Sequence, residues 1–124
     1  MTHHLRAGLL PLLALLTAGA TAAEAPAPGR YAGQFCVTSS ADKPSCGAAE
    51  IDLRSHGALR VKISDIVYQL QLHSSQIDVV LMHGAMQIDE FTTEYAWAGR
   101  SLQFADLDRQ ARYELRLEAR QTAK

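Results

Sequence analysis

Apolar and polar residues alternate along most of the chain after residue 30, in short segments separated by turn residues. This two-residue period is typical of β-strands that bury one face and expose the other. It is clearest where Ile66, Tyr68, Leu70 and Leu72 alternate with Val67 and polar residues. The pattern predicts strands near residues 30–37, 50–54, 59–63, 66–73, 77–83, 86–97, 102–104 and 112–118.

Three short turn signals fix how neighbouring strands pair. They lie at residues 74–75, 84–85 and 99–100, and glycine stands first in the last two, as a type II′ hairpin prefers. A register set by these turns keeps apolar residues on one face. The predicted pairs are Leu72 with Ile77, Leu70 with Val79, Tyr68 with Leu81, His83 with Met86, Leu81 with Ile88, Trp97 with Leu102 and Tyr95 with Phe104.

The alternation fails at one place, shortly after the second of these turns. Ile88 is expected on the inner face, which would put Glu90 inside and Phe91 outside. Phe91 nevertheless shares a face with Tyr95, which belongs to the core. The sequence therefore predicts a β-bulge or strand break at Asp89-Glu90 that restores the phase.

Eight short strands joined by short turns indicate an antiparallel meander. Such a sheet exposes two unpaired edges unless it closes on itself. The predicted fold is therefore all-β, an eight-stranded up-and-down β-barrel, with a β-sandwich as the alternative that the same strand count permits.

The start of the chain has the pattern of a secretory signal peptide. A short basic segment precedes the apolar run at 7–16, which falls short of the roughly 20 residues that span a bilayer. Small residues follow and end in Ala20-Thr21-Ala22, so cleavage is expected after Ala22.

Four segments follow from this assignment. The chain is expected to be exported, to the periplasm or to the medium, with no membrane span in the mature part. The predicted divisions are a signal peptide at 1–22, a flexible Pro/Ala tether at 23–29, a single β domain at 30–120 and a C-terminal tail at 121–124.

Both cysteines, Cys36 and Cys46, lie in the predicted β domain. In an exported protein two cysteines are expected to pair. Nine residues separate them, which is not the spacing of a thioredoxin-like redox site. We predict a structural disulfide, which stabilises the domain by roughly 3 kcal/mol in the chain-entropy estimate.

The charge balance argues against nucleic-acid and lipid binding. Removal of residues 1–22 leaves 11 basic against 13 acidic residues, a net charge of −2. A nearly neutral domain has no electrostatic attraction for a polyanion or an anionic membrane. Its charges alternate in sign, as on a solvated surface.

The sequence offers no motif for catalysis or for a cofactor. Met82, His83 and Met86 surround one turn and are side chains that suit Cu(I), but Met82 and His83 point to opposite faces of a strand. We therefore predict no enzyme activity, no cofactor and no metal site. The carboxylates are expected on outer faces and do not converge; they are Asp52, Asp78, Asp89, Glu94 and Glu114.

Two surfaces are candidates for contact with a partner. Val67, Val80 and Met82 are expected to form an apolar cluster on the outer face of one hairpin, which is unusual for a wet surface. The disulfide-anchored segment 37–45 is polar and expected to be a loop of fixed shape, and such loops often carry recognition.

These features favour a binding protein. In size, export signal, single disulfide and run of strands, the chain resembles small periplasmic inhibitor or immunity barrels, with no shared motif. That resemblance implies recognition of another protein in the envelope or the medium. The alternative is a carrier of a small apolar ligand inside the barrel, since eight strands can enclose one.

Overall fold

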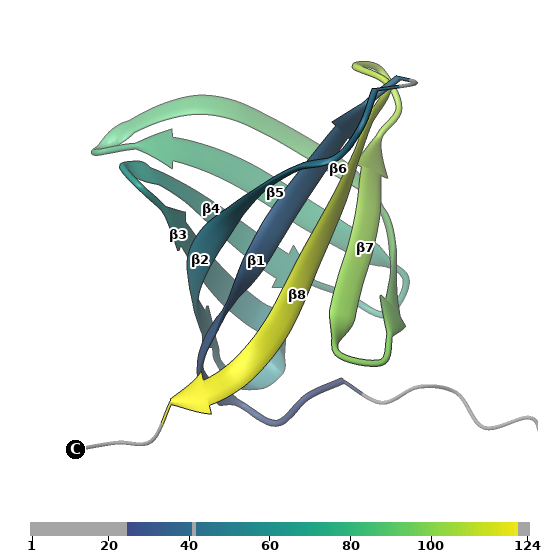
Figure 1. The fold of residues 1–124 in the computed structure, drawn as a ribbon. Coiled ribbons are helices and arrows are strands. Elements are labelled where there is room, and N and C mark those ends of the chain that lie inside the picture. Colours follow the sequence, from purple (N-terminus) through teal and green to yellow (C-terminus); the bar gives the residue numbers. More distant parts are fainter. Residues whose placement is uncertain (1–24, 41, 122–124) are drawn as a thin grey trace, which may run out of the picture.

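The computed structural model describes residues 25–40 and 42–121, which form a closed antiparallel barrel of eight strands (Figure 1). Each strand pairs with its neighbours in sequence, and β8 returns to β1. The predicted up-and-down barrel is therefore confirmed. Its strands are β1 (Gly29–Ser39), β2 (Ser45–Leu53), β3 (Ala58–Ile63), β4 (Ile66–Leu72), β5 (Gln76–His83), β6 (Met86–Ala98), β7 (Ser101–Asp106) and β8 (Ala111–Gln121).

The two ends of the barrel differ. The turns after β1, β3, β5 and β7 lie at one end, which we call the mouth; the other turns and the ends of the described chain lie at the base. A single 3-10 turn, Ser55–Gly57, connects β2 to β3 at the base.

The interior is filled by the alternating apolar side chains of all the strands. Five of them have no measurable exposure, and each such burial stabilises the fold by about 1.5–3 kcal/mol. These five are Val61, Ile77, Val79, Leu102 and Leu115.

Aromatic rings fill the interior toward the mouth. The rings of Phe104 and Tyr113 stack with their centroids 5.0 Å apart, and Phe35 meets Tyr68 edge-on at 4.6 Å. Phe91 stacks on Tyr113 at 6.0 Å. Offset and edge-on pairs of this kind are the favoured ring geometries.

The pairing of β4 with β5 confirms the predicted register. Leu72 lies opposite Ile77, Leu70 opposite Val79 and Tyr68 opposite Leu81. The third hairpin is also as predicted, with Trp97 opposite Leu102 and Tyr95 opposite Phe104.

The pairing of β5 with β6 contains the irregularity, but at a different residue. His83 lies opposite Met86 as predicted, whereas Leu81 lies opposite Asp89 and not opposite Ile88. The extra residue is thus Ile88, one position before the predicted Asp89-Glu90. Ile88 is 48% exposed, so the bulge turns it away from the core and brings Asp89 to the inner side.

A second irregularity lies where β8 closes the barrel against β1, between Ala32 and Gly33. A Cβ atom on Gly33 would lie 1.9 Å from the backbone oxygen of Arg116, closer than atoms can approach. Only glycine lets the two backbones come this near.

The disulfide joins Cys36 and Cys46, which lie directly opposite each other on β1 and β2. Pairing continues beyond it to Val37 and Ser45, so the connection is residues 40–44 and not the predicted loop at 37–45. The loop is shorter because the hydrogen-bonded ladder runs past the cysteines.

The barrel strands span residues 29–121, apart from the connections between them. Gly29 begins β1 and Gln121 ends β8. Next to β1, Ala27 accepts a hydrogen bond from the Tyr31 hydroxyl at 2.5 Å and Pro28 accepts one from Arg120 at 2.8 Å. The predicted signal peptide at 1–22 lies outside the described residues.

Candidate interaction surfaces

The predicted outer apolar cluster forms on β4 and β5. Val67 lies opposite Met82, and Val80 lies opposite Gln69 on the same face. All three apolar side chains are half-buried by their neighbours on the sheet. The structure therefore brings together the residues that the alternation placed there.

The bulge in β6 enlarges this cluster. Gln87 lies opposite Met82, and the extra residue Ile88 follows it on the exposed side of the strand. We define the outer apolar face as Val67, Val80, Met82 and Ile88. Ile88 was missed because strict alternation assigned it to the core; the phase break before Phe91 was the signal that could have found it.

Polar residues frame the outer apolar face. Lys62 lies opposite Val67 on the β3 side, and Glu90 lies opposite Val80 on the β6 side. Met86, at the tip of the β5–β6 hairpin, is 60% exposed. An apolar centre within a polar frame is the usual anatomy of a protein-binding patch.

A charged cluster closes the mouth of the barrel. Arg109, in the turn after β7, donates to Asp106 at 3.0 Å and to Asp89 on β6 at 3.2 Å. Asp106 is only 5% exposed. The two carboxylates raise the pKa of the Arg109 guanidinium, Asp89 more than Asp106.

Asp89 was expected on an outer face, and this prediction is wrong because the bulge moves it inward. The negative charge of Asp89 also helps to raise the pKa of Tyr68, a member of the aromatic cluster. Burial above all, then the neighbouring Tyr113 and Asp89, raises the pKa of Tyr68 to about 12. Sequence reasoning did not find the contact that joins Arg109 and Asp106 to Asp89.

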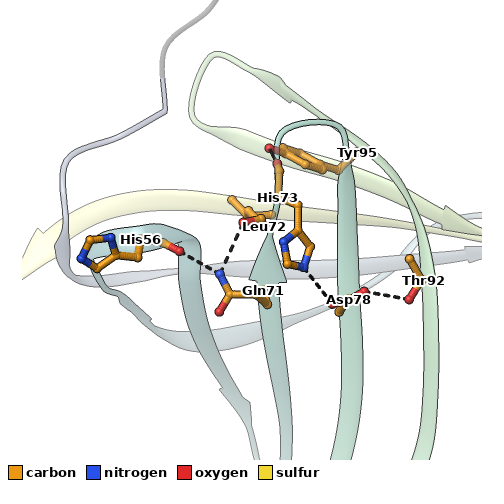
Figure 2. Close-up of polar contacts among 7 residues, drawn as sticks. All are labelled: His56, Gln71, Leu72, His73, Asp78, Thr92 and Tyr95. Atoms are coloured by element: carbon orange, nitrogen blue, oxygen red, sulfur yellow. Dashed lines mark hydrogen bonds and ion pairs between the residues drawn. The ribbon is translucent and has the colours of Figure 1, made fainter.

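A second polar cluster lies at the base, around the β4–β5 turn (Figure 2). Asp78 pairs with the His73 imidazole at 2.8 Å and accepts a hydrogen bond from the Thr92 hydroxyl at 2.8 Å. These bonds, the one from His73 first, lower the pKa of the Asp78 carboxyl. Tyr95 donates to the backbone oxygen of His73 at 2.5 Å, and Gln71 donates to that of His56 at 2.7 Å.

This cluster does not have the geometry of a nucleophile and its base. Catalysis of that kind needs the imidazole between the hydroxyl and the carboxylate. Here Asp78 lies between the other two groups, so the Thr92 proton is directed to a carboxylate. The contacts tie the turn to β6 and form a structural network.

The histidine at the hairpin tip makes an ion pair. His83 pairs with Asp65 at 3.1 Å, which lowers the pKa of Asp65. Met82 belongs to the outer apolar face. No group of three His, Cys, Asp or Glu side chains that could hold a metal occurs in residues 25–40 and 42–121.

The second predicted surface, the disulfide-anchored loop, is reduced to the short connection between β1 and β2. Ser40, which follows β1, is tied to the neighbouring turn, since it donates its backbone N–H to the Gln110 carbonyl at 2.9 Å. It therefore forms part of the rim of the mouth together with the β7–β8 turn.

Comparisons with family models, with curated proteins and with solved structures found no match to this chain. Within the described residues, none belongs to a helix long and apolar enough to cross a membrane.

Proposed function

We propose that this chain is a small exported domain that binds another protein through its outer apolar face. The carrying observation is the cluster of Val67, Val80, Met82 and Ile88 on the solvent side of the sheet. Scattered apolar residues are normal on a surface, but a contiguous group framed by charges marks a contact site.

The interior supports binding over transport of a small ligand. A carrier needs an apolar cavity of several hundred cubic ångströms within the barrel. Here stacked aromatic rings occupy the mouth half, and five aliphatic side chains with no exposure occupy positions on β3, β5, β7 and β8. This packing favours a filled barrel that works through its outside.

Two features support export. The pattern of residues 1–22 is that of a cleavable signal peptide. The disulfide Cys36–Cys46 is of a kind that persists in oxidising compartments. The partner is accordingly a protein of the cell envelope or the medium.

Photo-crosslinking in the native host tests the proposal. A photoreactive residue replaces Gln69, which is exposed beside Val80, or Ala48, which is exposed on β2. We expect one adduct of defined mass from position 69 and none from position 48. A retained small molecule in the native mass spectrum would support the carrier instead.

A matched pair of charge substitutions completes the test. Met82→Asp should abolish the adduct from position 69, because a charge in an apolar contact must lose its water. Ala48→Asp adds the same charge on β2 and should leave the adduct unchanged. An adduct that survives Met82→Asp would mean that the outer apolar face is not the contact site.

A further inference from the structure

The barrel wall is incomplete between β6 and β7. The two strands pair only from Tyr95 opposite Phe104 to Ala98 opposite Ser101. The rest of β6, residues 86–94, pairs with β5 alone. In Figure 1 the β5–β6 hairpin correspondingly leans away from the β7–β8 hairpin toward the mouth.

The β6–β7 turn decides which backbone groups of β6 face this split. Backbone N–H and C=O groups of successive residues in an antiparallel strand point alternately to its two sides. The tight turn at 99–100 directs those of Ala98 and Ala96 to β7, so those of Glu94, Thr92 and Glu90 point the same way. Beyond Tyr95 no β7 residue pairs with them.

A groove lies beside the base end of the split, where Thr93 and Glu94 of β6 line it, and extends over residues of β7, β8 and β1. Its volume is about 580 Å³, within the range of ligand clefts. Its lining combines apolar residues, among them Ala96, Phe104 and Tyr113, with polar and charged ones, among them Gln103, Arg112 and Glu114. Leu107, which is 78% exposed, stands on its β7–β8 side.

Arg109 bridges the split toward the mouth. It joins Asp106 of β7 to Asp89 of β6, and both carboxylates belong to the inner side of the wall. A chain bound at the free edge of β6 therefore lies beside this bridge and beside the aromatic residues that line the groove.

The charges along the free edge of β6 indicate which kind of chain binds there. If β6 paired antiparallel with β6 of a second copy around Thr92, Glu90 of each copy would face Glu94 of the other. Like charges directly opposite each other destabilise such a pairing. The same two carboxylates favour a segment that carries lysine or arginine.

We propose that the edge of β6 at residues 90–94 binds an extended, basic peptide segment of a partner protein as an added strand. Backbone hydrogen bonds to β6 provide affinity, as in other cases of strand addition, and the groove receives alternate side chains. The inference rests on the proposed binding function and names a second contact, next to the outer apolar face.

Selection from a phage-displayed library of random linear peptides, on the purified exported protein, tests this site. We expect enriched peptides with alternating apolar residues and at least one lysine or arginine. Thr92→Pro removes an N–H that faces the split and should weaken their binding about tenfold or more. Thr92→Val loses the same hydroxyl but keeps the N–H, so it should bind as the native protein does.

A second variant tests the same site by charge, in case the proline variant does not fold. Glu94→Lys leaves Glu90 beside one added positive charge, so it should abolish the preference for basic peptides, and its fold can be checked by amide NMR spectra. Failure to enrich any peptide, or equal binding to Thr92→Pro and Thr92→Val, would overturn the inference. Peptides that lose binding to Met82→Asp and keep it to Thr92→Pro would place recognition on the outer apolar face, which sustains the proposed function and refutes the strand site.

Discussion

Strand β5 pairs with β4 on one side and with β6 on the other, and the two hairpins differ by a single extra residue. The β4–β5 ladder is unbroken from Ile66 to Leu72. The β5–β6 ladder skips Ile88. The first hairpin keeps every apolar side chain where alternation puts it, whereas the second turns Ile88 outward and Asp89 inward.

That reversal changes both the outer surface and the mouth of the barrel. Ile88 moves to the surface and extends the outer apolar face. Asp89 moves inward, where it meets Arg109 and closes the mouth of the barrel. A bulge of one residue thus contributes both to the outer apolar face and to the charged cluster at the mouth.

The largest expected effect separates the two hairpins directly. Ile77→Ala, in the regular ladder, removes a side chain with no exposure and should lower the free energy of unfolding by about 2–5 kcal/mol. Ile88→Ala should cost less than about 1 kcal/mol, because Ile88 is 48% exposed. Urea unfolding of both variants provides the measurement. Equal losses would mean that Ile88 lies in the core and that the bulge is elsewhere.

The β4–β5 hairpin could be predicted because its turn and its alternation agree. The presence of an irregularity before Phe91 could be predicted too, since the phase had to be restored. Its position could not, because an extra residue at Ile88 or at Asp89-Glu90 brings Phe91 inward equally. The alternation carries no information that distinguishes these positions.

The charged cluster at the mouth could not be predicted from the sequence, for a different reason. Arg109 and Asp106 are close in the chain, but Asp89 reaches them only after β6, β7 and β8 have closed the wall. Contacts made by closure leave no local periodicity. Likewise, no pattern shows that β6 and β7 part beyond Tyr95, since both continue as good strand sequences.

Asp106 provides the next test, at the mouth. Asp106→Asn removes a buried carboxylate that accepts hydrogen bonds from Arg109, and we expect a loss of about 1–3 kcal/mol in unfolding free energy. Asp108→Asn, in the exposed part of the same turn, should change it by less than about 0.5 kcal/mol. Indistinguishable variants would show that the Arg109 cluster does not stabilise the mouth.

A smaller effect concerns the alkaline limit of stability. The folded-state pKa of Tyr68 is raised to about 12 from an ordinary value of 10.0, so its contribution is present below pH 10 and is lost as pH rises toward 12. Tyr68→Phe should flatten that loss in unfolding measured against pH. Asp89→Asn should lower the Tyr68 pKa in an NMR titration. No change with Asp89→Asn would argue against its inward position.

The smallest expected effect concerns the two His–Asp pairs, one at each end of β5. The pKa of Asp78 is lowered mainly by its hydrogen bond with His73, and that of Asp65 mainly by its bond with His83. A carboxyl with a lowered folded-state pKa contributes stability above its unfolded pKa and loses it as pH falls through the folded value. His73→Gln should therefore raise the pKa of Asp78 toward 3.8 and leave Asp65 unchanged.

His83→Gln should do the reverse, so each variant is the control for the other. Carbon-detected NMR titration of the two carboxyl groups distinguishes them. If His83→Gln moved only Asp65, the β5–β6 tip would be held by the same kind of exposed contact as the β4–β5 turn. The difference between the hairpins would then reside in the bulge and not in their turns. A shift of both carboxyls with either variant would instead show that the two ends of β5 are coupled through the sheet, which the separate ion pairs do not allow.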